Sequence, residues 1–224
     1  MCIKRIVVRI EISTLSNPDG KFNHQKMDRL AMLLSNLNNS GMQLILVSSG
    51  AIALGSDKLN LDSQPETYED MQAVAAIGQA ELIRFYQRYF DQYNQIVAQV
   101  LLTSDILDTE IRRQNTQNTF NTLLGMNIIP IVNENDTVST SDIELDDNYP
   151  LAMNVALITK ADVILIKMDQ NSKFVIQPRL PLKARMVNDD LQLYSQLEDT
   201  FAELDKLKEV HDHFPASVDQ IWNK

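Results

Sequence analysis

Two short polar segments follow apolar runs and have side chains that could bind a small anionic ligand. In the first, Ser48, Ser49 and Gly50 follow the apolar residues 44–47 and precede helix-forming residues. Backbone N–H groups at a helix start, aided by the helix dipole and two hydroxyls, can hold a carboxylate or a phosphate. A serine cap in a tight turn would explain the same residues without a ligand, and local physics alone favours that simpler interpretation.

The second polar segment, Asn133–Val138, follows the apolar run at 128–132. Asp136 could bind an ammonium group, and the asparagine amides could bind a carboxylate or orient the loop. Ordinary turns built on Asx residues explain this segment equally well. The acidic stretch at 142–148 could bind a metal or form a lid, although a solvated acidic loop is the simpler interpretation.

Apolar runs rich in Ile and Val predict the strands that must position these segments. They lie at 3–10, 43–47, 95–101, 128–132 and 162–166 and lack polar alternation, as in strands buried on both sides of a parallel sheet. Apolar residues at helical spacing predict helices at about 27–37, 71–89, 111–124, 151–160 and 197–210. This order predicts an α/β fold, an open αβα sandwich with a mainly parallel central sheet. We expect run 3–10 at its centre, between 43–47 and 162–166.

The bulk composition excludes several classes of protein. The chain has 224 residues, a formal net charge of -10 and one cysteine, Cys2. This charge gives no global attraction for nucleic acid or for an anionic membrane. A single cysteine excludes a disulfide framework, and the first apolar run is too short for a signal peptide. We expect a single cytoplasmic domain over 1–224 that binds neither nucleic acid nor membrane, with a divergent segment at about 186–224.

Several fragments stand in a specific order along the chain: RIVVRI at 5–10, STL at 13–15, LVSSGAIALG at 46–55, AAIGQ at 75–79, QVLLT at 99–103, IPIVNENDTVS at 129–139, DN at 147–148 and PR at 178–179. Each fragment alone is a weak signal, but the ordered set, over about residues 3–185, is highly specific. It resembles the glutamate 5-kinases, a group within the amino acid kinases.

The resemblance implies an enzyme that transfers the γ-phosphoryl group of ATP to the side-chain carboxylate of L-glutamate, in proline biosynthesis. It assigns glutamate binding to Ser49, Asp136 and Asn148. Asp136 suits the substrate ammonium, and Ser49 and Asn148 suit its carboxylates as donors. Arg9 would stabilise the transferred phosphoryl group, and Asp169 would lie on the nucleotide side. Mg²⁺ would bridge the ATP phosphates without a metal site of the protein's own, and a homo-oligomer is implied.

The chain departs from the family pattern mainly on the nucleotide side. The first strand of the family ends in Lys-Ile/Leu-Gly, and here Arg9 and Glu11 occupy the lysine and glycine positions. Glu11 puts a negative charge where phosphate should approach. The nucleotide turn is Met168-Asp169, no glycine follows Gly125, and the family's Thr-Gly-Gly-Met-x-Thr-Lys motif is not found. Lys167 and Lys173 are the candidate substitutes for a missing cation.

Three hypotheses follow from this combination of matches and departures. The first is an ATP-dependent glutamate 5-kinase or a recent derivative, with phosphoryl transfer that is very slow or absent. The second is a non-catalytic glutamate-binding or regulatory subunit derived from the kinase. The third is a related kinase with another small carboxylate as acceptor, because Tyr149 and Pro150 replace an Asp-Arg type pair beside Asn148.

Overall fold

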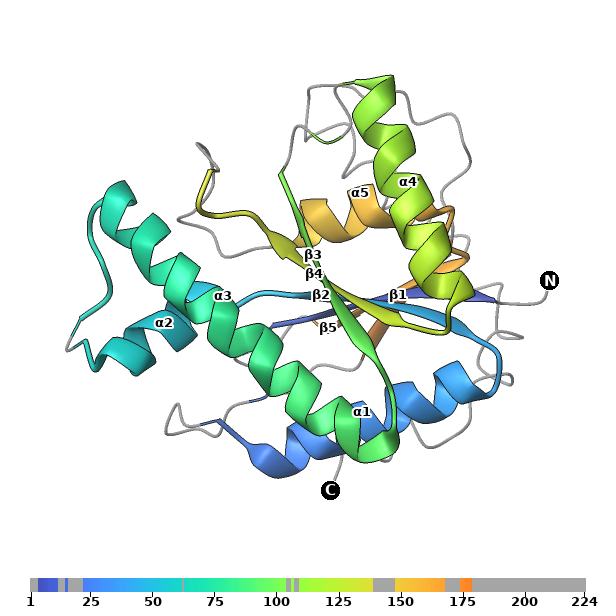
Figure 1. Cartoon of the computed structure of the whole chain (residues 1–224), viewed down its shortest axis with the longest axis horizontal. Helices are drawn as coiled ribbons and strands as arrows, with labels where there is room; N and C mark the ends of the chain where they lie inside the picture. Colours follow the sequence, from blue (N-terminus) through green and yellow to red (C-terminus); the bar gives the residue numbers. More distant parts are fainter. Residues whose placement is uncertain are drawn as a thin grey trace.

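A six-stranded sheet in the order β3-β4-β2-β1-β5-β6 forms the middle of the structure (Figure 1). The computed structural model describes residues 4–11, 15, 22–61, 63–103, 106, 109–138, 148–167 and 174–178. The strands are β1 (Arg5–Ile10), β2 (Gln43–Ser48), β3 (Val97–Leu102), β4 (Ile129–Glu134), β5 (Val163–Lys167) and β6 (Phe174–Pro178). All neighbouring pairs are parallel except β5 and β6, which are antiparallel. The predicted mainly parallel sheet is therefore confirmed, and β6 is a strand that the apolar pattern did not predict.

Strand β1 lies at the centre of the sheet, between β2 and β5. Val8 is in register with Leu46 of β2 and with Leu165 of β5. Residues 6–10 of β1 are all buried, because helices cover both faces of the sheet. The predicted central position of this strand is confirmed.

Strand β3 is the exception to the prediction of strands buried on both sides. It lies at the edge of the sheet and pairs only with β4. Gln99 and Leu101 are exposed, whereas Val97 and Leu102 are buried. An edge strand has one neighbour instead of two, so part of its surface remains open to solvent. The composition of the 95–101 run did not reveal this difference.

Helices pack on both faces of the sheet, which confirms the predicted αβα sandwich (Figure 1). They are α1 (His24–Asn39), α2 (Ala51–Leu59), α3 (Tyr68–Phe90), the 3-10 helix η2 (Asp91–Tyr93), α4 (Glu110–Gly125) and α5 (Tyr149–Thr159). One core joins α1 and α3 to the sheet, and a second core joins α4 and α5 to the opposite face. The helix expected at 197–210 and the divergent segment lie outside the described residues.

Local sequence signals explain where several helices begin and end. Thr67 caps α3 by accepting a hydrogen bond from the Asp70 N–H, and Glu69 and Asp70 occupy the first turn, where the helix dipole favours negative charge. Gly41 follows α1 with φ of 96°, a conformation that favours glycine.

Within the described residues, no helix is both long enough and apolar enough to cross a membrane.

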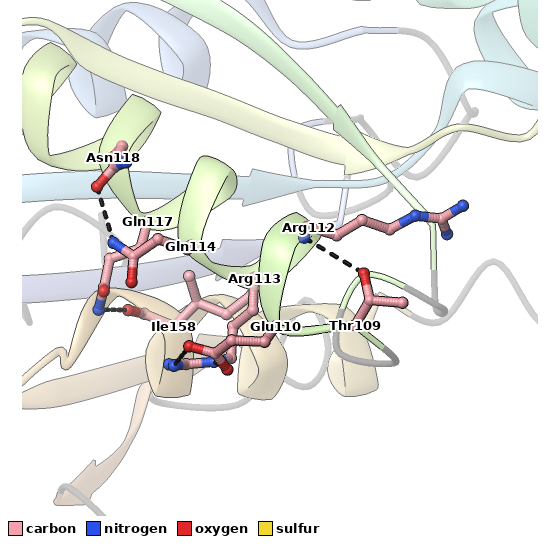
Figure 2. Close-up of polar contacts among 8 residues, drawn as sticks. All are labelled: Thr109, Glu110, Arg112, Arg113, Gln114, Gln117, Asn118 and Ile158. Atoms are coloured by element: carbon pink, nitrogen blue, oxygen red, sulfur yellow. Dashed lines mark hydrogen bonds and ion pairs between the residues drawn. The ribbon is translucent and has the colours of Figure 1, made fainter.

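Helix α4 contacts the rest of the structure through a narrow stripe. Its buried residues, Thr116, Phe120 and Leu124, recur every fourth position, and most of its other side chains are polar. Gln117 donates a hydrogen bond of 2.7 Å from Nε2 to the Ile158 carbonyl, which belongs to the last turn of α5 (Figure 2). Carbonyl groups in a last helical turn lack partners within the helix, so this bond both caps α5 and joins it to α4.

Two glycines allow α2 and α3 to approach each other very closely. A Cβ atom added to Gly78 of α3 would lie 1.6 Å from the Ala51 carbonyl oxygen of α2. A Cβ atom added to Gly55 of α2 would lie 2.1 Å from the Val74 carbonyl oxygen. Because these neighbours are backbone atoms, they cannot rotate away. The absence of side chains at both positions therefore sets the distance between the two helices.

We expect Gly78→Ala to destabilise the protein by about 3 kcal/mol or more, the upper part of the range for overpacked sites, because α2 or α3 must move. The measurement is the free energy of unfolding from urea titration. Gly125→Ala is the matched control, since a Cβ atom there meets nothing within 4 Å. The control should change stability by no more than about 1 kcal/mol. Equal stability of the two variants would contradict the close helix contact.

Candidate functional site

The candidate site lies at the carboxyl ends of β2 and β4, in the segments that follow these two strands. Ser48 ends β2, Ser49 and Gly50 follow, and α2 begins at Ala51. The N-cap residue of α2 is Gly50, with φ of 102°, so a serine side chain does not cap this helix. The simple serine-cap interpretation is therefore wrong. Ser49 is buried directly before the helix start, where N–H groups point along the dipole.

A chain of buried amide side chains connects this point to β4 and α5. Asn148, the N-cap residue of α5, donates from Nδ2 to the Ser48 carbonyl at 2.7 Å and to Asn133 Oδ1 at 2.6 Å. Asn133 Oδ1 also accepts from the Glu134 N–H at 2.9 Å. Asn133 Nδ2 donates to Gln79 Oε1 of α3 at 2.7 Å. The amide chain Gln79–Asn133–Asn148 thus ties four elements together at one edge of the sheet.

The direction of these bonds changes the role expected for Asn148. A side-chain amide has two N–H donors, and both donors of Asn148 are already used within the protein. The role of donor to a substrate carboxylate therefore does not fit this arrangement. Asn148 lies beside Ser49, because its Nδ2 donates to the carbonyl of Ser48, the residue before Ser49. A shared site for Ser49 and Asn148 requires this proximity.

Tyr86 of α3 forms a hydrogen bond with the last residue of β2. Its hydroxyl lies 2.8 Å from Ser48 Oγ, and Ser48 Oγ donates to the Ser49 carbonyl at 3.3 Å. Since a serine hydroxyl has one hydrogen, Tyr86 is the donor in this pair. Burial raises the pKa of Tyr86 to about 12, so the phenol stays protonated and keeps donating at neutral pH. Helix α3 thereby stabilises the carboxyl end of β2, which borders the site.

Asp136 lies in a turn three residues beyond Asn133, at the same edge of the sheet. The Asn135 N–H donates to the Leu102 carbonyl at 2.7 Å, which fixes the turn against β3. The Val138 N–H donates to the Asn135 carbonyl at 3.1 Å, which closes a turn over 135–138, and Thr137 Oγ1 donates to Asn135 Oδ1 at 2.5 Å. The predicted ordinary turn is therefore present, and Asp136 lies half-buried within it.

Arg9 lies in β1, next to β2, and its charge already has a partner. Arg9 is in register with Val47 of β2, one residue before Ser48. Its side chain is buried, and Nη2 contacts Glu11 Oε1 at 2.7 Å. Of the residues expected to meet phosphate, Arg9 is the one with a described side chain. Asp169, Met168, Lys173 and residues 142–147 of the acidic stretch at 142–148 lie outside the described residues, as does the side chain of Lys167.

Sequence reasoning from the residues gave Gln79 and Tyr86 no role at the site. They lie seven residues apart on α3, which places them on the same helix face. Gly78, beside Gln79, marks the closest part of the contact with α2. The signal that could have revealed Gln79 is its polar side chain beside the apolar stripe of the helix. In the described part of the chain, no group of three His, Cys, Asp or Glu residues could hold a metal ion.

The amino acid kinase family model matches residues 4–173 of the chain. The chain belongs to the amino acid kinase family. It is 43% identical over 208 residues to a glutamate 5-kinase of Enterococcus faecalis, an alignment that covers 91% of this chain and 74% of the relative. It is 40% identical over 200 residues to a glutamate 5-kinase of Clostridium perfringens, covering 88% and 74%.

Similar solved structures include two UMP kinases. The one from Ureaplasma parvum has a TM-score of 0.48 and 14% identity, covering 74% of this chain and 69% of that chain. The one from Bacillus anthracis has a TM-score of 0.46 and 15% identity, covering 73% and 64%. Membership of the amino acid kinases rests on the family match and on the glutamate 5-kinase relatives.

We expect Asn148→Asp to destabilise the fold by about 2 to 4 kcal/mol, because a carboxylate cannot donate to the Ser48 carbonyl or to Asn133 and leaves buried acceptors facing each other. Urea unfolding measures the change. Asn118→Asp is the matched control, because the exposed Asn118 accepts from Gln114 at 2.9 Å and an aspartate keeps that acceptor (Figure 2). A stable Asn148→Asp protein would mean that these two bonds do not hold α5 to the sheet.

Proposed function

We propose that this chain is a glutamate 5-kinase-like phosphotransferase that binds L-glutamate at the carboxyl ends of β2 and β4 and transfers phosphate slowly. The observation that supports the proposal is that Asn148 donates to the carbonyl of Ser48, the residue before Ser49, and to Asn133, three residues before Asp136. The relatives named glutamate 5-kinase support the same substrate.

The described geometry suggests how glutamate would be held. The Asp136 carboxylate would accept hydrogen bonds from the substrate ammonium. Ser49 Oγ and the first N–H groups of α2 would donate to a carboxylate, because the positive end of the helix dipole lies there. These groups act locally, so they can bind an anionic substrate although the chain has a formal net charge of -10.

ATP is the phosphoryl donor in this proposal, and Mg²⁺ bridging its phosphates would supply charge stabilisation. Arg9 would face the transferred group, and its contact with Glu11 weakens the attraction of its positive charge for phosphate. The described residues therefore fit glutamate, the phosphoryl acceptor, better than they fit ATP. The role of Asp169 on the nucleotide side stays a prediction. We also propose a cytoplasmic role in proline biosynthesis, a single domain over residues 1–224 and a homo-oligomer.

We expect Asp136→Asn to weaken glutamate binding by about 1.5 to 3 kcal/mol, the range for a hydrogen bond to a charged group. Calorimetric titration with glutamate measures the change. Asp57→Asn, at an exposed position of α2, is the matched control and should bind as the wild type does. Unchanged affinity in Asp136→Asn would remove the ammonium assignment, and a wild type that binds no glutamate would refute the proposed function.

We expect the wild type to form γ-glutamyl phosphate at less than about 1 per second, the low end of usual enzyme turnover. A hydroxamate trap with saturating Mg-ATP and glutamate measures the rate. Glu11→Gln should raise the rate by about tenfold, because Arg9 then loses a charged partner and can contact phosphate. Glu66→Gln, at an exposed position, is the control. Fast turnover of the wild type would contradict the expected impairment.

The alternative is a non-catalytic glutamate-binding subunit that retains the sheet and the glutamate side. The ion pair between Arg9 and Glu11 is the observation that favours it, because it neutralises the described cation that the resemblance assigns to the phosphoryl group. Separate titrations distinguish the two functions. Binding of glutamate without binding of Mg-ATP, together with no turnover in Glu11→Gln, would support the subunit.

A further inference from the structure

Gln79 is a polar residue on α3 that reaches the candidate site through one contact. Its Oε1 accepts a hydrogen bond of 2.7 Å from Nδ2 of Asn133, and Asn133 is almost fully buried. Gly78, next to it, holds α3 against the backbone of α2. Because the helix cannot shift without breaking that contact, the position of Gln79 relative to the site is fixed.

The hydrogen-bond direction along the amide chain is set by backbone groups. The Glu134 N–H can only donate, so the atom of Asn133 that faces it must be the oxygen. The Ser48 carbonyl can only accept, so the atom of Asn148 that faces it must be the nitrogen. Asn133 must then present its nitrogen to Gln79, whose oxygen is the matching acceptor.

Asn148 Oδ1 is a polar atom of the amide chain that remains for a ligand. Both N–H groups of Asn148 are used, and among the described residues no hydrogen bond to its Oδ1 is found. A free carbonyl oxygen accepts hydrogen bonds and repels carboxylates, so it suits an ammonium group. An ammonium group has three N–H donors, and a second acceptor beside the Asp136 carboxylate would satisfy more of them.

We propose that Gln79 is a positioning residue for amino-acid recognition: by accepting from Asn133 Nδ2 it holds Asn133 in the place where Asn133 Oδ1 binds Asn148. The Asn148 amide, whose direction the Ser48 carbonyl sets, is thereby kept where its Oδ1 meets the α-ammonium group of the substrate. The inference rests on the proposed function, since it assumes that an amino acid binds here. It predicts that Gln79 affects the binding of α-amino dicarboxylates and leaves dicarboxylates without an amino group nearly unchanged. Gln79 itself does not touch the substrate.

The test compares Gln79→Met, which removes the acceptor at similar length, with Gln79→Glu, which keeps an oxygen at the same position. Gln87→Met is the matched control, because Gln87 is an exposed glutamine of the same helix. Calorimetric titration gives the Kd of each protein for L-glutamate and for glutarate, which lacks the ammonium. Thermal unfolding of each variant shows whether the fold is intact.

We expect Gln79→Met to raise the Kd for glutamate by about five- to tenfold, the effect of one net hydrogen bond, and the Kd for glutarate by less than about twofold. Gln79→Glu should restore glutamate binding to within about threefold of the wild type, and Gln87→Met should match the wild type. This pattern supports the inference, because a merely structural role would not separate the two ligands.

Other outcomes overturn it. Unchanged glutamate affinity in Gln79→Met, an equal loss for glutamate and glutarate, or no recovery in Gln79→Glu would each reject the positioning role while glutamate binding by the wild type stands. If the wild type binds no glutamate, the proposed function fails and the positioning role fails with it.

Discussion

The hydrogen bonds of the Asn148 amide are the interaction on which the site depends. At the carboxyl edge of a parallel sheet, the strands leave the ladder and their last backbone groups need other partners. The Ser48 carbonyl is buried at this point, and Asn148 satisfies it at 2.7 Å while also contacting Asn133. A single side chain therefore joins the ends of β2 and β4 to the start of α5. Leaving such buried groups unpaired would cost about 1 to 3 kcal/mol each.

Helix α3 braces this arrangement from the first core. Tyr86 contacts Ser48, Gln79 contacts Asn133, and Gly78 brings the helix against α2. The three contacts act on three different parts of the site: the end of β2, the end of β4 and helix α2, which begins at Ala51. We therefore expect a substitution on the buried face of α3 to alter substrate binding, although α3 does not contact the substrate.

The two sides of the expected reaction are built differently. The proposed glutamate side consists mainly of neutral dipoles, namely amides, a hydroxyl and a helix start, with Asp136 as a charged member. The phosphate side has a described cation, Arg9, that is already paired with Glu11. Because phosphoryl transfer depends on placed positive charge, we expect this pair to affect catalysis more than substrate binding.

The sequence alone determined the fold class, because Ile- and Val-rich runs alternating with helical stripes fit a covered parallel sheet. It also located the polar segments around Ser49 and Asp136 at strand ends. It did not show that the 95–101 run forms an edge strand or that β6 adds an antiparallel strand, since both depend on neighbours distant in the chain. Only the tertiary structure decided the orientation of the Asn148 amide and the roles of Gln79 and Tyr86. Hydrogen-bond direction depends on which donors and acceptors meet in space, and residue type and spacing do not specify that.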